Sequence, residues 1–91
     1  RSSVGYRVVW KRKLDKQIAK LPQMEKFKFV ELVNDLKEKG VIQPEWPNYS
    51  KLGDNAYHCH LSRKWIACWK WFEENIVIEV YYAGSRENAP Y

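Results

Sequence analysis

Cysteine is scarce in this chain: its 91 residues include two, Cys59 and Cys68. A small secreted domain held by disulfides usually carries more, so we expect reduced thiols and a cytoplasmic location. Glycine and proline are also few, four of each, and 30% of the residues are charged, which argues against a disordered chain. No apolar run approaches the roughly 20 residues of a membrane span, and no signal-peptide pattern is present.

Aromatic residues, by contrast, are plentiful. The chain holds five Trp and six Tyr, which is ample material for the single small core that a chain of this length can build. We therefore expect one domain over residues 1–91. The first residue is Arg1 rather than Met, and we expect residues 1–4 to be flexible or foreign to the domain.

Positive charge is concentrated near the start of the chain. Residues 1–28 carry nine Lys or Arg against two acidic residues, whereas the net charge of the whole chain is +5. The densest run is Lys11, Arg12 and Lys13. A basic region on a small domain favours a polyanionic partner, most often nucleic acid. The alternative is a solvated helix face that is rich in lysine.

Apolar spacing predicts one strand, two helices and three further strands. Leu14, Ile18 and Leu21 fall on one helical stripe, and Pro22 interrupts that helix but suits the start of the next. Gly40 is the expected end of the second helix. The expected elements are strands at 6–10, 56–61, 65–72 and 76–83, helices at 14–21 and 22–39, and a loop at 41–50.

This order, β-α-α-β-β-β, predicts an α+β fold. A helix hairpin packed on one face of a mainly antiparallel four-stranded sheet is the simplest way to bury both helical stripes. The core stripe expected for the second helix consists of Phe29, Val33 and Leu36, widened by Met24, Phe27, Val30 and Leu32.

The last two strands indicate which sheet face is the core. Ile76, Ile78 and Val80 alternate with more polar residues, so we expect them to point inward. A tight turn at residues 74–75 would then place Trp71 opposite Ile78. The same turn places Lys70 opposite Glu79 as a cross-strand ion pair.

Two histidines, His58 and His60, alternate along the preceding strand with an apolar set. We expect Tyr57, Cys59 and Leu61 to face the core, which leaves the histidines on the open face. This register needs an odd-length connection, such as Ser62, Arg63 and Lys64. A two-residue loop would bury the histidines instead, and we favour the odd loop because two imidazoles buried against tryptophans would need polar partners.

The open face would then combine His58 and His60 with Cys68, Lys70 and Tyr81. Histidine exchanges protons near neutral pH, arginine holds phosphate at two points, and aromatic rings stack on splayed bases. This is the chemistry of an RNA-cleaving site. The alternatives are a surface histidine pair without function, or a metal site, for which partner ligands with a recognisable spacing are lacking.

Four segments together resemble the RelE/ParE superfamily of type II toxin–antitoxin toxins. They are the Lys51-Leu52 lead-in, the YHCHL strand at 57–61, the VIEVYYAG strand at 77–84, and the tail SRENAPY at 85–91. The resemblance covers nearly the whole chain. It implies a microbial RNase fold, metal-free and cofactor-free cleavage of mRNA in the ribosomal A site near 16S rRNA, and a cognate antitoxin as partner.

The resemblance also implies roles for individual residues. His58 and His60 stand where family members place basic residues, as base or phosphate ligands. Arg86 matches a basic residue after the last strand that would stabilise charge in the transition state or on the leaving group, and Tyr91 matches a C-terminal tyrosine that stacks on or orients the nucleotide. A family arginine aligns with Ile66, so its role is vacant unless Arg63 fills it. The expected RNA-binding residues are Lys11, Arg12, Lys13, Lys51, Lys64, Lys70 and Tyr81.

Two other functions fit the same fold. ParE-type toxins inhibit DNA gyrase without cleaving RNA, and a nucleic-acid-binding domain need not be toxic at all. The combination of histidine, arginine and tyrosine favours the nuclease, because a pure binder does not need two histidines on one open face.

Overall fold

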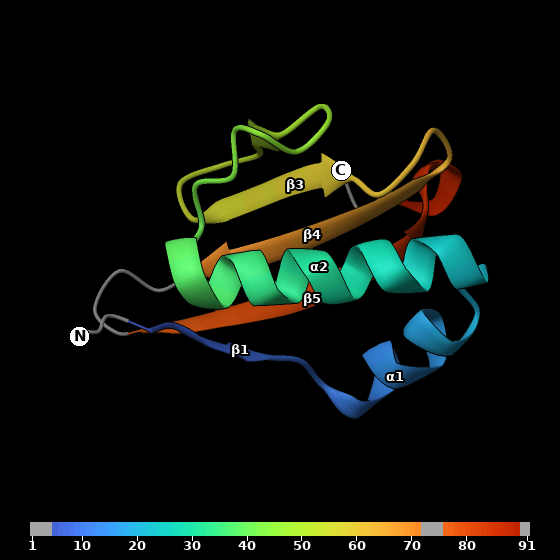
Figure 1. Ribbon diagram of the computed structural model, residues 1–91, viewed down its shortest axis with the longest axis horizontal. Helices are drawn as coiled ribbons and strands as arrows, with labels where there is room; N and C mark the ends of the chain where they lie inside the picture. Colours follow the sequence, from blue (N-terminus) through green and yellow to red (C-terminus); the bar gives the residue numbers. More distant parts are fainter. Residues whose placement is uncertain (1–4, 72–75, 90–91) are drawn as a thin grey trace.

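Alternating apolar side chains build a five-stranded mixed sheet with strand order β1-β5-β4-β3-β2 (Figure 1). The computed structural model describes residues 5–71 and 76–89. Its strands are β1 Arg7–Val9, β2 Ser50–Lys51, β3 Ala56–His60, β4 Trp65–Trp71 and β5 Val77–Ser85. Its helices are α1 Arg12–Ala19, α2 Gln23–Lys39 and the short 3-10 helix η1 Arg86–Asn88.

The predicted order of strands and helices is confirmed, with one addition. A β1–β5 pair that runs parallel makes the sheet mixed, and all other pairs are antiparallel. The prediction of four strands was wrong because Ser50 and Lys51, at the end of the expected loop, pair with β3 as the edge strand β2. Two residues are too few to show a period of two, so the sequence carries no strand signal there.

Helix α2 lies across β4 and β5 and covers one face of the sheet (Figure 1). The predicted stripe of Phe29, Val33 and Leu36 is buried, and so is Leu32 of its expected widening. The rest of the expected widening was wrong: Met24, Phe27 and Val30 are 69%, 61% and 55% exposed. These three residues recur at intervals of three on the opposite side of the helix, so they cannot share the buried stripe.

Helix α1 packs beside the edge of β5 that β1 leaves uncovered after Val9. Leu14 is buried there, and the side-chain oxygen of Gln17 accepts a hydrogen bond from the backbone N–H of Ala83 at 3.1 Å. This bond satisfies a strand-edge donor that would otherwise lack a sheet partner. The edge of β5 is therefore closed first by β1 and then by α1.

The connection between β3 and β4 has the expected odd length. His60 pairs with Ile66 and the backbone N–H of Leu61 donates to the carbonyl of Trp65 at 2.7 Å, so residues 62–64 form the turn. Cys59 consequently lies in the main core, and His58 and His60 lie on the other face.

The register between β4 and β5 is also as predicted where the chain is described. Trp71 pairs with Ile78 and Lys70 pairs with Glu79, with 3.6 Å between the Lys70 Nζ and Glu79 Oε1 atoms. The expected turn at residues 74–75 lies outside the described residues. Placing Ile76 in the core was wrong, because it precedes β5 and is 56% exposed.

Three aromatic rings join the segment after α2 to the centre of the sheet. The rings of Tyr49, Tyr57 and Trp69 stack on one another with centroids 6.2–6.3 Å apart. The indole N–H of Trp69 also donates to the carbonyl of Val41 at 3.3 Å. Such pairs contribute about 0.5–1.5 kcal/mol beyond area burial. As expected for scaffold, all five tryptophans lie in or against the core.

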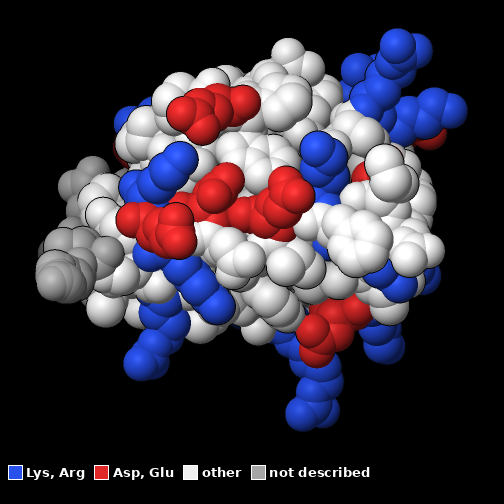
Figure 2. All heavy atoms as spheres, in the orientation of Figure 1, with Lys and Arg blue, Asp and Glu red and all other residues white. Residues whose placement is uncertain are grey.

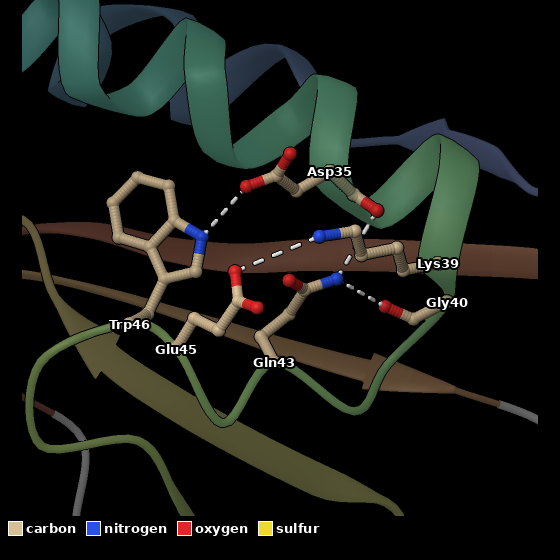
Figure 3. Close-up of polar contacts among 6 residues, drawn as sticks. All are labelled: Asp35, Lys39, Gly40, Gln43, Glu45 and Trp46. Carbon is tan, nitrogen blue, oxygen red and sulfur yellow. Dashed lines mark hydrogen bonds and ion pairs between the residues drawn. The ribbon is translucent and has the colours of Figure 1, made fainter.

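Gln43 anchors the same segment to the end of α2 (Figure 3). It is 2% exposed, and its side-chain N–H groups donate to the carbonyls of Gly40 at 2.8 Å and Asp35 at 3.1 Å. The indole N–H of Trp46 donates to the Asp35 carboxylate at 2.9 Å. The bond to Gly40 satisfies a carbonyl that follows the last helical turn and has no intrahelical partner.

Replacing Gln43 by Ala should therefore lower the free energy of unfolding by about 1–3 kcal/mol, since the Gly40 carbonyl loses a buried donor and the Asp35 carbonyl a partly buried one. Urea unfolding followed by tryptophan fluorescence measures this change. Lys39→Ala is the matched control, because its ion pair with Glu45 is exposed and should contribute at most about 1 kcal/mol. Equal losses in the two variants would contradict the anchoring role of Gln43.

Candidate functional site

The two histidines form a compact pair on the sheet face opposite α2. Their ring centroids are 5.8 Å apart with an interplanar angle of 55°. They lie across from Cys68 and Ile66 of β4, as the predicted register requires. The expectation of an exposed pair was wrong in degree, however, because His58 is 7% exposed and His60 is 8% exposed.

Residues 47–50 lie against β3 and supply polar partners for both histidines. The hydroxyl of Ser50 lies 3.1 Å from Nδ1 of His58, and the amide nitrogen of Asn48 lies 3.3 Å from Nδ1 of His60. The backbone N–H of His60 donates to the carbonyl of Pro47 at 2.9 Å. Each imidazole therefore has the polar partner that a buried ring requires.

Arg86 approaches His60 from the end of the sheet that carries the β3–β4 turn. It begins η1 directly after β5, and its backbone N–H donates to the carbonyl of Lys64 in the β3–β4 turn at 2.8 Å. Burial, first of all, lowers the pKa of His60, and the charges of His58 and Arg86 lower it further. His60 is thus a neutral imidazole near pH 7 with an arginine beside it.

Neither thiol has the properties of a nucleophile. Burial raises the pKa of Cys68 to about 12, and it also raises that of Cys59, which is completely buried in the main core. A buried, protonated thiol is inert. Cys59 is therefore a small core residue, as predicted, and Cys68 fills the space under the opposite sheet face.

A β-bulge in β5 places two successive tyrosines on the histidine side of the sheet. The register shifts between Cys68, which pairs with Tyr82, and Trp69, which pairs with Val80, so Tyr81 is the inserted residue. Such an insertion re-aims a side chain. Tyr81 contacts Cys68, and its ring lies 6.0 Å from Nζ of Lys70. Burial raises the pKa of Tyr81 to about 12, so its hydroxyl remains protonated.

A groove of about 570 Å³ runs between α1 and this bulge. Predicted RNA-binding residues line it: Lys11 and Lys13 from the start of α1, and Lys70 and Tyr81 from the sheet. Glu79, the partner of Lys70, lines it as well. The groove therefore combines three cationic side chains with an aromatic ring, which suits a nucleotide strand.

The remaining predicted site residues lie in different parts of the molecule. Arg63 and Lys64 are exposed in the turn beside Arg86, and Arg12 is exposed on α1. Lys51 pairs with Tyr57, its ammonium lying 6.0 Å from that ring, so it belongs to the face opposite the histidines. Tyr91 lies outside the described residues.

Sequence reasoning missed Asn48 and Ser50 as partners of the histidines and Tyr82 as a residue of the open face. The bulge that turns Tyr82 has no signature in the VIEVYYAG run. Asn48 offered a faint signal, since asparagine after proline favours a turn. In the structure it has a φ of 53°, in the left-handed region that asparagine tolerates best after glycine.

The charge on the α2 side does not favour a polyanion. Figure 2 shows acidic side chains gathered along the middle of this face, with Lys and Arg side chains projecting from its rim. Helix α2 itself carries the exposed Glu31 and Glu38. The basic groove at α1 is therefore the better site for nucleic acid.

Metal-binding clusters and membrane-spanning helices are both absent from the described part of the chain. Within residues 5–71 and 76–89, no three His, Cys, Asp or Glu side chains cluster in a way that could hold a metal ion. None of the helices described in those ranges is long and apolar enough to cross a membrane.

Comparison with solved structures identifies the fold. The RelE–RelB complex from Pyrococcus horikoshii contains a chain that matches with a TM-score of 0.74 and 18% identity, over 93% of this chain and 99% of that one. Isolated E. coli RelE matches with a TM-score of 0.72 and 17% identity, over 93% of this chain and 88% of that one. A chain of the YoeB dimer from Staphylococcus aureus matches with a TM-score of 0.68 and 10% identity, over 89% of this chain and 97% of that one. No model of a known protein family and no curated sequence matches. The predicted resemblance is thus confirmed for the fold.

The lowered pKa of His60 should make stability depend on pH. Below the ordinary histidine pKa of 6.5, the unfolded chain binds a proton at His60 that the folded chain does not bind until a lower pH. The stabilisation that comes from keeping His60 neutral is therefore complete above pH 6.5, and the free energy of unfolding should fall as the pH drops below that value. Urea unfolding at pH 7.5 and pH 5.5 should show a smaller fall for His60→Asn, and an identical fall would contradict the assignment.

Proposed function

We propose that this chain is the toxin of a type II toxin–antitoxin pair and cleaves mRNA as a metal-independent endoribonuclease. One observation carries the proposal: two histidines share a sheet face beside Arg86, on a fold like that of RelE. The basic groove beside α1 supports an RNA substrate. A gyrase inhibitor on this fold would gain nothing from the paired imidazoles.

Cleavage would use the 2′-hydroxyl of the RNA as nucleophile. A neutral imidazole takes the hydroxyl proton as the new bond between the 2′-oxygen and phosphorus forms. The bond from phosphorus to the 5′-oxygen breaks, and water supplies the proton that the leaving oxygen needs. The products are a 2′,3′-cyclic phosphate, which water can open to a 3′-phosphate, and a 5′-hydroxyl end.

Arg86 would stabilise the negative charge that builds on the phosphate oxygens in the transition state. Guanidinium is always protonated and binds phosphate at two points. The backbone of Arg86 is hydrogen-bonded to the β3–β4 turn, and this bond would hold the guanidinium close to His60. Arg63 and Lys64 in that turn extend the cationic surface on which the scissile phosphate would lie.

The groove between α1 and the bulge would hold the neighbouring nucleotides. Lys11, Lys13 and Lys70 meet the phosphates, and Tyr81 offers a ring for a base. Tyr91 is proposed to stack on or orient the nucleotide at the cleavage point.

The partners follow from the same proposal. Pyrococcus horikoshii RelE was solved as a complex with RelB, and we extend this to a cognate antitoxin for the present chain. Cleavage is proposed to occur in the cytoplasm, in the ribosomal A site, where a contact from the exposed Arg12, which does not line the groove, to 16S rRNA would add affinity.

The test is primer extension on mRNA in a translation extract. Replacing His58, His60 or Arg86 by Ala should each lower the rate of cleavage by about 10²–10⁴-fold, the range for loss of a proton-transfer or charge-stabilising group. Arg7→Ala is the matched control for Arg86, because Arg7 is exposed on β1 at the far edge of the sheet. Intact message with stalled replication would instead identify a gyrase inhibitor, and full cleavage by the three variants would refute the site.

A second test separates binding from chemistry. The double variant Lys11→Ala/Lys13→Ala should bind single-stranded RNA more weakly and with a shallower salt dependence. The slope of log K against log salt should fall by about 0.7 for each phosphate that the variant no longer neutralises. Fluorescence anisotropy over a series of salt concentrations measures the slope. Lys26→Ala/Lys28→Ala removes the same charge from exposed positions on α2, so an equal change there would contradict the groove as the RNA path.

A further inference from the structure

We propose that Asn48 is a positioning residue that holds His60 in the tautomer protonated on Nε2, so that His60 donates a hydrogen bond to the scissile phosphate and His58 acts as the base. This division of roles rests on the proposed ribonuclease activity. The tautomer itself does not, because it follows from contacts within the protein.

The contact between Asn48 and His60 fixes the direction of the hydrogen bond. The amide nitrogen of Asn48, 3.3 Å from Nδ1 of His60, can only donate. Nδ1 must then accept, and a neutral imidazole that accepts at Nδ1 carries its proton on Nε2. His60 consequently has no lone pair on Nε2 with which to remove a proton from a substrate.

The backbone around Asn48 is shaped to hold this contact. Asn48 has a φ of 53°, which makes it the non-glycine residue with positive φ within residues 5–71 and 76–89. Such a conformation is strained for a residue with a Cβ and persists where the surroundings enforce it. The preceding carbonyl, of Pro47, accepts from the backbone N–H of His60 at 2.9 Å. Two adjacent residues therefore hold both the main chain and the side chain of His60.

Solvent reaches the other ring nitrogen. Among the described residues, no buried side-chain nitrogen or oxygen lacks a hydrogen-bond partner, and the hydrogen bond that the structure gives the His60 ring uses Nδ1. Nε2 is therefore accessible to solvent. An Nε2–H group at that point can donate to a phosphate oxygen that replaces water.

The charged groups around His60 favour the neutral ring. The ring of His58 faces it from the same strand, Arg86 faces it from η1, and Asn48 is uncharged. Burial opposes protonation of His60 first of all, and the positive charge of Arg86 opposes it further. A proton on His58 would oppose it in the same way. The ring thus remains a neutral donor near pH 7 and does not compete for the proton of the 2′-hydroxyl.

His58 has a partner of a different kind. The hydroxyl of Ser50, 3.1 Å from its Nδ1, both donates and accepts. Ser50 can accept from a protonated Nδ1, which leaves the lone pair on Nε2 of His58 and stabilises the imidazolium once that lone pair has taken a proton. In the cleavage step His58 gains the 2′-hydroxyl proton, and His60 holds the phosphate without changing its own protonation.

Two variants at one position test the tautomer. Asn48→Asp replaces an amide donor by a carboxylate, which only accepts, and should move the His60 proton to Nδ1 and raise the pKa of His60. Asn48→Gly removes the side chain, and glycine adopts a φ near 53° without strain, so the fold should persist while the tautomers mix. The measurement is the imidazole ¹⁵N NMR spectrum of the full chain against pH.

The spectrum of the wild-type chain should show a protonated Nε2 and an unprotonated Nδ1 at His60. A protonated Nδ1 there, or an unchanged spectrum in Asn48→Asp, would overturn the proposal. In the primer-extension assay both variants should cut mRNA at least about 10²-fold more slowly, with a changed pH profile for Asn48→Asp. Full activity in both would overturn the role of Asn48. If the wild-type chain shows the expected tautomer but leaves RNA intact, the tautomer stands and the ribonuclease activity fails.

Discussion

The turn at Ser62–Lys64 decides which sheet face receives each side chain of β3. Its odd length pairs His60 with Ile66 and Cys59 with Ala67, so the apolar residues of β3 enter the main core and the imidazoles leave it. A turn shorter by one residue would exchange the two sets. Tyr57 and Cys59 stabilise the observed register because they fill the space under α2 together with Trp69. Every feature of the candidate site depends on this choice, including the approach of Arg86, whose backbone bonds to the turn itself.

The segment between α2 and β3 also shapes the candidate site, because it carries the hydrogen-bond partners of both histidines. Gln43 ties its beginning to the end of α2, and the stacked ring of Tyr49 ties its end to the sheet. Asn48 and Ser50 stand on either side of Tyr49 in sequence, and they reach the opposite face of the sheet from the one on which Tyr49 stacks. Packing of Tyr49 in the core thereby positions the polar side chains of Asn48 and Ser50 on the other face of the sheet. Preorganisation of this kind is what a site needs when its own contacts are few.

The sequence predicted those parts of the molecule that have a period. Alternation in β3 and β5 was sufficient for the face of the histidines and for the pairing of Lys70 with Glu79. It failed where the period breaks or is too short: the two-residue strand β2, the bulge at Tyr81 and the exposed side of α2 at Phe27. The burial of the histidines could not be predicted for a related reason. Their contacts with Asn48 and Ser50 depend on the path of an aperiodic loop and not on any pattern in β3.

Burial and chemistry are linked at this site. Burial and the neighbouring positive groups penalise the protonated form of His60. The neutral ring keeps the ability to donate or accept a hydrogen bond in a medium where such bonds are strong. Two imidazoles side by side can serve different purposes when their hydrogen-bond partners differ. In this chain the distinction lies in the partners of Nδ1: an amide that can only donate to His60, and a hydroxyl that leaves His58 either tautomer.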